Sequence, residues 1–489
     1  MYSWCINGIE CHKITIEVDI APGLPAFVIV GLPDTAVNEA RDRVRSAIKA
    51  SGFDFPKTRV TVNLAPAHIK KAGSGFDLAI ALSILEAQGT FTRGEKYHGA
   101  TAVGELALNG AVRPVLGIVP ILSAAKKDGS ILIVSQQHAS IARECGISHA
   151  SFASSLADIV QAIHSDSIPL VEIPDISVVA VAQHSVRFED ILGQTAAKRA
   201  MEIAAAGMHH SMLGGPPGVG KTLLARALPS ILPPMTQAER MEATMIASLQ
   251  NPNPQLIQTR PFRAPHHSSS PVALLGGGAQ VAPGEITLAH RGVLFLDELP
   301  EFRRDVIEAL REPLEHGEIT VRRAQGAATY PAACMVVVAY NPCPCGYGNE
   351  KCQCSPAQVE RYRKKLSGPF MDRMDIKCTV TIVPSELQLQ QQVSESSEHI
   401  RARVMAASER QLLRQGVHNA LLSHRTVRTM LDSLPIQEKG LLHGAVESGK
   451  LSLRGQSKAL KVARTIADLA GEENISTAHI LEALTYVIV

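Results

Sequence analysis

The most informative stretch of this sequence reads Gly215-Pro216-Pro217-Gly218-Val219-Gly220-Lys221-Thr222. It fits the glycine-rich phosphate-loop pattern, and the helix-forming residues Leu223–Leu228 follow it directly, as the pattern requires. Glycines let backbone N–H groups close around phosphates at a helix N-terminus. We expect Lys221 to neutralise the β and γ phosphates of ATP and the Thr222 hydroxyl to bind Mg²⁺. An ordinary Gly/Pro turn needs neither side chain, which favours a nucleotide site.

A buried strand that ends in two carboxylates lies downstream, in Gly292-Val293-Leu294-Phe295-Leu296-Asp297-Glu298. We expect Asp297 to hold Mg²⁺ and Glu298 to polarise the attacking water. The alternative, two acids that cap the next helix, is disfavoured by the phosphate loop upstream. A third strand, Met335–Tyr340, ends at Asn341, whose amide is placed to orient that water. The three stretches predict a site that hydrolyses ATP.

The pattern of apolar residues predicts three domains. Residues 1–173 mix β-branched runs with helical ones and indicate an α/β domain. Residues 186–383 alternate short apolar strands with helices, as expected of a parallel sheet. Residues 384–489 are rich in Leu, Ala, Glu, Gln and Arg and predict a helical lid. The fold class expected is therefore α/β, with a linker at Pro174–Arg187 between the first two domains.

Composition limits the kinds of partner. The chain of 489 residues has 45% hydrophobic and 19% charged residues, as a soluble globular protein does. No run approaches the roughly twenty apolar residues that span a bilayer, so no membrane partner is expected. The net charge of +2 gives no overall field for nucleic acid, and such contacts must come from local clusters. Nine cysteines, four of them crowded together, argue against disulfides and for a cytoplasmic protein.

Other stretches resemble a known family. Arg260–His267, Pro283–His290 and Asn341–Gly346 look like their counterparts in the magnesium-chelatase-related AAA+ proteins. Near the N-terminus, Gly31–Val37 and Val62–Ala67 narrow the resemblance to the ComM/YifB family, over nearly the whole chain. The resemblance implies a homo-oligomeric, hexameric helicase that drives branch migration of incoming DNA during natural transformation. Single-stranded and branched DNA are the partners implied.

The resemblance also implies roles for three polar residues. Asn341 matches the sensor-1 position of AAA+ proteins. Arg373 matches the arginine finger, which reaches the γ-phosphate of a neighbouring subunit and so implies a ring. The alternative for Arg373 is an ion pair with a neighbouring aspartate in its own subunit. Arg454 resembles the sensor-2 arginine of the helical lid.

The N-terminal region of this family is similar to the Lon protease domain, so a serine–lysine dyad has to be considered. In Lys71–Asp77, which resembles the Lon nucleophile segment, the serine position falls on Gly75, and Ser74 lies one place early. The lysine position falls on Val119. A dyad without its base cannot activate a serine. We therefore expect the domain to be proteolytically inactive and to serve structure or assembly.

Four cysteines, Cys343, Cys345, Cys352 and Cys354, form two close pairs in a loop rich in Pro and Gly. Four thiolates suit a tetrahedral Zn²⁺ site. The pairs are tighter than the usual spacing of two intervening residues, so reduced thiols without a metal stay an alternative.

Two elements are candidates for DNA contact. Arg322 and Arg323 lie in an expected hairpin, Glu318–Gly326, whose turn is predicted near Gln325-Gly326. Paired arginines suit phosphate contact, and the alternative is a solvated surface charge. The other element is Arg263–Gly284, which resembles an insertion of this AAA+ clade.

The sequence leaves three functions to compare. We expect an ATPase that translocates on DNA and moves branch points. The first alternative is a magnesium-chelatase-type chaperone that remodels a protein partner for metal insertion, and the second is a nucleotide-gated scaffold. An intact Glu298 disfavours the scaffold. His266 and His267 are expected to make hydrogen bonds within their loop.

Overall fold

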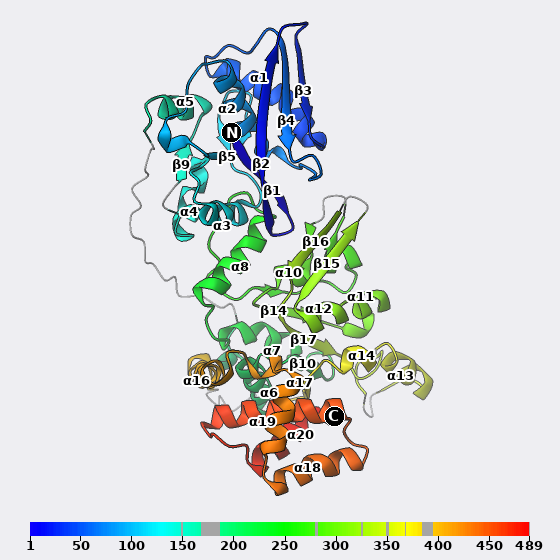
Figure 1. The fold of residues 1–489 in the computed structure, drawn as a ribbon. Coiled ribbons are helices and arrows are strands. Elements are labelled where there is room, and N and C mark those ends of the chain that lie inside the picture. The colour runs from blue at the N-terminus through cyan, green and yellow to red at the C-terminus, as the bar shows by residue number, and fades with distance from the viewer. Residues whose placement is uncertain are drawn as a thin grey trace. The chain divides into compact units, whose positions relative to one another are not determined.

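The structure is a computed structural model that describes residues 1–147, 150–167, 186–278, 282–323, 326–348, 352–366, 368–383 and 395–488. It separates into two compact units (Figure 1). The first comprises Met1–Val179 with Arg240–Ile257, and the second comprises Ala180–Glu239 with Gln258–Val489. No helix among the described residues is long and apolar enough to cross a membrane.

The first unit is built on a seven-stranded sheet of order β3-β4-β2-β1-β5-β8-β9. β2 is antiparallel to both β1 and β4, and the other pairs are parallel. The strands are β1 (Tyr2–Asn7), β2 (Glu10–Ala21), β3 (Ala26–Val30), β4 (Arg59–Ala65), β5 (Thr101–Val103), β8 (Leu132–Ser135) and β9 (Ala150–Ala153). Short strands β6 (Glu105–Leu106) and β7 (Val112–Arg113) form a separate pair.

Helices contribute to two apolar cores in this unit. In β8, Ile133 belongs to the core with α1 and α2, whereas Leu132 and Val134 belong to the core with α3 and α4. This follows from the period of two along a strand, which sends alternate side chains to opposite faces. The helices are α1 (Thr35–Ala50), α2 (Asp77–Ala87), α3 (Ile118–Asp128), α4 (Ala139–Glu144) and α5 (Leu156–His164).

Part of the range 186–383 packs with the first unit. This part is the stretch 240–257, which includes most of the helix α8 (Gln237–Ser248). The backbone N–H of Gly117 donates to the Ser248 carbonyl over 2.7 Å. Three apolar side chains of the stretch contact the core of α3 and α4, namely Met241, Met245 and Leu256. The range predicted for the ATPase core is thus not contiguous in space.

The second unit contains a five-stranded sheet in which every pair is parallel, of order β11-β14-β17-β10-β18. This confirms the α/β class and the parallel sheet predicted from the sequence. The strands are β10 (Ser211–Gly214), β11 (Phe262–Arg263), β14 (Val293–Leu296), β17 (Met335–Tyr340) and β18 (Ile376–Thr379). β10 and β14 are buried along their whole length, as is typical of parallel strands covered on both faces.

Helices and two small hairpins accompany this sheet. The helices are α6 (Thr195–Gly207), α7 (Lys221–Ala227), α9 (Pro271–Leu275), α10 (Glu285–Leu288), α11 (Arg304–Ala309), α12 (Arg311–His316), α13 (Pro356–Arg363) and α14 (Gly368–Met371). One hairpin pairs β12 (Gly276–Gly277) with β13 (Ala282–Pro283). The expected hairpin pairs β15 (Glu318–Arg323) with β16 (Gly326–Pro331) (Figure 1). Of the turn predicted near Gln325-Gly326, Gln325 lies outside the described residues, and Gly326 is the first residue of β16, where it pairs with Arg323.

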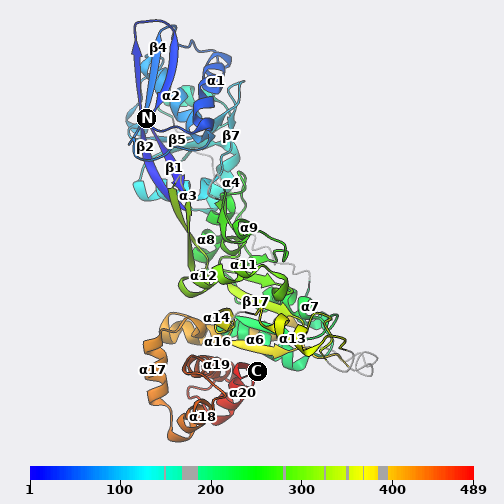
Figure 2. The same cartoon turned by 90° about the vertical axis from the view of Figure 1, so that its right-hand side faces the viewer.

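The C-terminal part of the second unit is helical, as predicted, and appears in orange and red in Figure 2. It comprises α16 (Ser397–Gln415), α17 (His424–Ser433), α18 (Ile436–Glu447), α19 (Leu453–Ala470) and α20 (Thr477–Val487). Its apolar residues join those of α6 and the sheet in one continuous core. The predicted start of this region at residue 384, and most of the linker at 174–187, lie outside the described residues.

Candidate functional site

The phosphate-loop residues connect β10 to α7, which begins at Lys221. Gly218 and Gly220 have φ angles of +78° and +94°, a left-handed conformation that glycine adopts without strain. The Lys221 ammonium donates to the carbonyls of Gly215 and Pro216 over 2.7 and 2.8 Å. Burial lowers the pKa of Lys221, and the carboxylates that follow β14 act in the opposite direction. Carbonyl groups of the phosphate loop therefore hold the ammonium group of Lys221.

Asn341 lies at the same site. It follows β17, which pairs with β10 in parallel, so the two strands deliver their loops to one edge of the sheet. The Lys221 ammonium donates to Asn341 Oδ1 over 2.9 Å. The structure therefore brings together two of the residues that the sequence predicts to act on the γ-phosphate.

Thr222 and Asp297 form a second contact at this edge. The Thr222 hydroxyl donates to Asp297 Oδ2 over 2.8 Å, and the Glu298 N–H donates to Asp297 Oδ1 over 3.0 Å. A carboxylate and a hydroxyl side by side supply the oxygen ligands that Mg²⁺ prefers. The donor set therefore fits the ion that the sequence predicts.

Glu298 adopts a left-handed backbone conformation, with φ of +53°, directly after Asp297. Its side chain is 52% exposed, and Oε2 lies 3.4 Å from Nδ1 of His267. The rings of His267 and His266 are in contact, with centroids 4.0 Å apart and an interplanar angle of 35°, while His266 hydrogen-bonds to Ser268. The loop hydrogen bond expected for His266 is present. The pairing of His267 with Glu298 does not follow from the sequence, where adjacent histidines are its only signal.

Gln194 is a further residue of the site that sequence reasoning misses. Its side-chain amide donates to the carbonyls of Val219 and Thr381 over 3.1 and 2.7 Å. It has a φ of +54° and directly precedes α6. Gln194 therefore ties the phosphate loop to the segment that follows β18. No motif in the sequence marks a pairing between positions so far apart.

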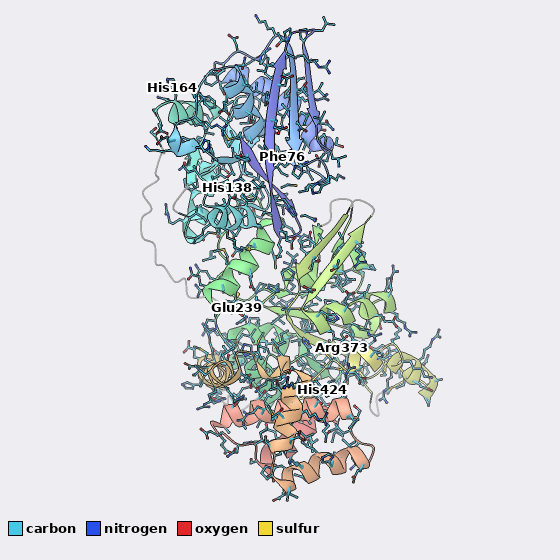
Figure 3. All side chains as sticks on the ribbon, in the orientation of Figure 1. Phe76, His138, His164, Glu239, Arg373 and His424 are labelled. Atoms are coloured by element: carbon cyan, nitrogen blue, oxygen red, sulfur yellow. The ribbon has the colours of Figure 1, made fainter. Side chains whose placement is uncertain are left out.

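Arg373 and Arg454 both contact one carboxylate, that of Glu315 in α12, and Figure 3 labels Arg373. Arg373 Nη2 lies 2.6 Å from Glu315 Oε2, and Arg454 Nη2 lies 3.5 Å from Oε1. The hydrogen bond from Arg373 lowers the pKa of the Glu315 carboxyl. Among the described residues, Arg373 forms its ion pair with Glu315 and not with a neighbouring aspartate. The structure brings the two predicted arginines to each other rather than to Lys221.

The four cysteines of the sequence pattern come together in space. Their Sγ atoms all lie within 4.8 Å of one another. Cys343 is 3.3 Å from Cys345 and 3.5 Å from Cys352, and Cys345 is 3.6 Å from Cys352. Backbone hydrogen bonds from Tyr347 and Gln353 lower the pKa of Cys345 to about 6. The four sulfur atoms are therefore close enough together to bind one metal ion.

The candidate DNA contacts lie on the β15–β16 hairpin. Arg322 is exposed, on the face of β15 opposite its buried apolar side chains. It lines a surface pocket together with Glu312 and Arg373. The side chain of Arg323 lies outside the described residues, although its backbone pairs with that of Gly326.

The positions compared with the Lon dyad do not form one. The Ser74 hydroxyl donates to the Glu105 carboxylate. Val119 is fully buried in α3, where no base replaces it. Lys71, in the same segment as Ser74, is fully buried and donates to the Pro66 carbonyl.

Comparison with known proteins gives matches along most of the chain. The family described as magnesium chelatase, subunit ChlI, matches residues 187–387, and its C-terminal family matches 394–487. A third family, subunit ChlI of Mg-chelatase, matches 16–138. The magnesium-chelatase 38 kDa subunit of Cereibacter sphaeroides is 24% identical over 61% of this chain and 89% of its own length.

Two relatives match over almost the whole length. The competence protein ComM of Haemophilus influenzae is 43% identical over 99% of this chain and 96% of its own. The protein YifB of Salmonella typhimurium is 43% identical over 98% of this chain and 95% of its own. With identity at this level over the complete fold, the chain belongs to the ComM/YifB family of magnesium-chelatase-related AAA+ proteins.

Proposed function

We propose that this chain is a cytoplasmic ATPase that forms a hexameric ring on DNA and moves branch points during recombination of incoming DNA. The observation that carries the proposal is the convergence of Lys221, Thr222, Asp297 and Asn341 at one edge of the parallel sheet. The 43% identity to a competence protein supports a role in natural transformation.

The phosphate loop would hold ATP through charge and backbone dipoles. The Lys221 ammonium would exchange its bonds to backbone carbonyls for bonds to phosphate oxygens, because charge-assisted bonds between ions are stronger. Thr222 and Asp297 would hold Mg²⁺, which neutralises charge on the phosphates. Glu298 would accept a proton from the attacking water, and Asn341 would orient that water. The side chain of Glu298 is half exposed at the edge of the site, so water can reach the carboxylate.

Arg373 and Arg454 are proposed to act on the nucleotide when copies of the chain assemble. Arg373 would reach the γ-phosphate of a neighbouring copy, and Arg454 would act from the helical lid. Their shared contact with Glu315 supports this. It places both guanidinium groups at one carboxylate of their own chain rather than at its phosphate loop. An arginine finger in trans requires a ring, which is the basis for the assembly proposed.

Arg322 and Arg323 are proposed to contact DNA phosphates. The exposed face of β15 that carries Arg322 supports this, because replacing water by phosphate around an exposed guanidinium costs little free energy. Single-stranded and branched DNA are the proposed partners. The competing function, a magnesium-chelatase-type chaperone for a protein partner, rests on the more distant identity of 24% to a chelatase subunit.

Zinc is proposed as a further ligand, at the four cysteines. A tetrahedral site with Zn–S bonds of about 2.3 Å places sulfurs about 3.8 Å apart. The sulfur distances of 3.3, 3.5 and 3.6 Å in the cluster come close to that value. A disulfide requires about 2.05 Å, so the spacing fits metal ligands and not cystines.

Strand displacement on a three-stranded DNA substrate tests the proposed function. We expect movement of the branch point with ATP and Mg²⁺, and none with the Glu298→Gln variant. An ATPase that DNA does not stimulate, and that leaves branched DNA unchanged, would favour the chaperone. No hydrolysis of ATP by the purified protein would refute both.

A further inference from the structure

The cysteine cluster lies directly against the phosphate loop. Gly346, between the two cysteine pairs, has a φ of +90°. A Cβ atom at this position would lie 2.8 Å from Pro217 Cδ and 3.1 Å from Pro217 Cγ. Such a distance is shorter than van der Waals contact, so the backbone of the cysteine loop touches the proline ring with no space between them. Pro217 is one of the residues of the phosphate loop.

The same loop also begins at the site. Asn341, which accepts a hydrogen bond from Lys221 over 2.9 Å, stands two residues before Cys343. Cys343 is buried, whereas the other three cysteines are partly buried. The cysteine loop is therefore anchored at two points of the ATP site, through Asn341 at its start and through Gly346 in its middle.

A helix closes the other end of the loop. Ser355, directly after Cys354, caps α13 by accepting a hydrogen bond from the Gln358 N–H over 3.3 Å. In α13, the buried Tyr362 has a hydrogen bond to the Asn341 backbone. The helix that follows Cys354 is thus in contact with Asn341, the residue at which the loop begins.

We propose that a zinc ion bound by Cys343, Cys345, Cys352 and Cys354 clamps this loop against the phosphate loop, so that ATP hydrolysis depends on the metal. The proposal rests on the ATPase and the zinc site proposed above. Four metal–sulfur bonds fix the loop, whereas weak contacts between thiols do not offset the entropy of ordering it. Without the metal, Pro217 and Asn341 would lose a fixed neighbour, and the groups around the γ-phosphate would lose their alignment.

Metal removal gives the first test. We expect about one zinc per chain by elemental analysis, lost in the Cys352→Ser/Cys354→Ser double variant. The kcat/KM for ATP should fall at least about tenfold in that variant, and likewise after a zinc-selective chelator with Mg²⁺ in excess. Added Zn²⁺ should restore the chelated protein and not the variant. Cys11→Ser, in the other unit, is the matched control and should keep both zinc and activity.

A second variant tests the contact without removing a ligand. Gly346→Ala keeps all four cysteines but places a methyl group into Pro217. We expect zinc to stay near one per chain and kcat/KM for ATP to fall at least about tenfold. Gly416→Ala is the matched control, because Gly416 has a φ of +74° but nothing within 4 Å of an added Cβ. It carries the same backbone strain without the contact, and its ATPase should be unchanged.

The results of these experiments distinguish the zinc site, the clamp and the proposed ATPase from one another. Protein that hydrolyses ATP but carries no zinc overturns the metal site. Zinc-bearing protein whose ATPase survives chelation, or survives Gly346→Ala, overturns the clamp and leaves the ATPase intact. Zinc-bearing protein without any ATPase refutes the proposed function instead.

Discussion

Nδ1 of His267 lies 3.4 Å from Oε2 of Glu298, the carboxylate proposed to activate water. The two residues follow neighbouring strands, since β11 pairs in parallel with β14. His267 also contacts Phe302 edge to face, with ring centroids 6.5 Å apart, which limits where the imidazole can point. The contact therefore connects the water-activating position to the Arg263–Gly284 segment, a candidate DNA-contacting element.

Replacing Glu298 should separate ATP binding from hydrolysis. Glu298→Gln keeps the size of the side chain but removes the base, so the protein should bind ATP and hydrolyse it at least about a hundredfold more slowly. Binding of a fluorescent ATP analogue and phosphate release measure the two steps. Lys221→Ala is the contrasting variant and should lose binding as well, because no other group in the loop carries positive charge to the phosphates. Near-normal turnover by Glu298→Gln would contradict the assignment.

Replacing His267 should change turnover rather than ATP affinity. The pair is half exposed, so it contributes at most about 1 kcal/mol, which corresponds to about fivefold in rate. We expect His267→Ala to leave the KM for ATP unchanged and to raise basal kcat by up to that factor, because Glu298 is released. The extra stimulation by DNA should fall.

His267→Asn offers the control for that experiment, because its amide N–H can replace Nδ1 as a donor to the carboxylate. It should retain most of the DNA stimulation. A rise in KM with unchanged kcat in His267→Ala would show that the residue serves nucleotide binding instead.

His209 should be required for stability of the second unit. It is fully buried and bonds to Asp375 Oδ2 over 3.0 Å and to Thr465 Oγ1 over 2.8 Å. His209→Ala leaves a buried carboxylate without this partner, which should cost about 2–3 kcal/mol in unfolding free energy. Denaturant unfolding of His209→Ala, Asp375→Asn and the double variant measures this, and the double variant should cost less than the sum. Additive effects would show that the two side chains act independently.

The same pair predicts a dependence on pH. Burial acts to raise the pKa of Asp375, but the hydrogen bond from His209 and the electrostatic attraction of His209, His210 and Lys458 together outweigh it, and the net pKa lies below the usual value. A lowered folded-state pKa contributes stability that is present above the unfolded value of about 3.9 and is lost as pH falls through the folded value. Wild-type protein should therefore lose more stability on acidification below about pH 4 than Asp375→Asn does.

The arrangement of the candidate ATP site was predictable because each of its parts is a short continuous stretch of sequence. Each part ends a short apolar strand, and parallel strands place such ends at one edge, so the contacts of Lys221 with Asn341 and of Thr222 with Asp297 follow from the pattern. The four cysteines came together for a similar reason, since one short loop holds them.

The remaining features depend on pairings that no local pattern encodes. Glu315 meets Arg373 across 58 positions, and Gln194 meets Thr381 across 187. The stretch 240–257 reads as a helix and loop within the ATPase range, but three of its apolar side chains are partly buried against a core of the first unit. The periodicity of apolar residues shows that a helix has an apolar face, and only the tertiary structure shows which core that face joins.

Arg373→Ala should abolish hydrolysis in a way that a partner subunit can rescue. An arginine finger stabilises charge on the γ-phosphate, so its loss should lower kcat at least about a hundredfold with little change in ATP binding. If the finger acts on a neighbouring copy, mixing Arg373→Ala with Lys221→Ala subunits should restore part of the hydrolysis, because the intact loop of an Arg373→Ala subunit can then meet the intact arginine of a Lys221→Ala neighbour. A mixture no more active than either variant alone would place Arg373 in its own subunit.

Changing Arg322 and Arg323 to Ala should weaken DNA binding and abolish branch movement, while basal ATPase and assembly stay intact. Each phosphate contact releases about 0.9 counterion on duplex DNA and about 0.7 on single strands, so the log–log salt dependence of binding should flatten by at most about two units. The control is Arg303→Ala/Arg304→Ala, because these arginines are exposed and form surface ion pairs in the same unit. The loss should be uniform across DNA sequences, since phosphates carry no sequence information. If the Arg322/Arg323 variant moves branches at the parental rate throughout a salt titration, the hairpin does not grip DNA, and the Arg263–Gly284 segment becomes the element to test.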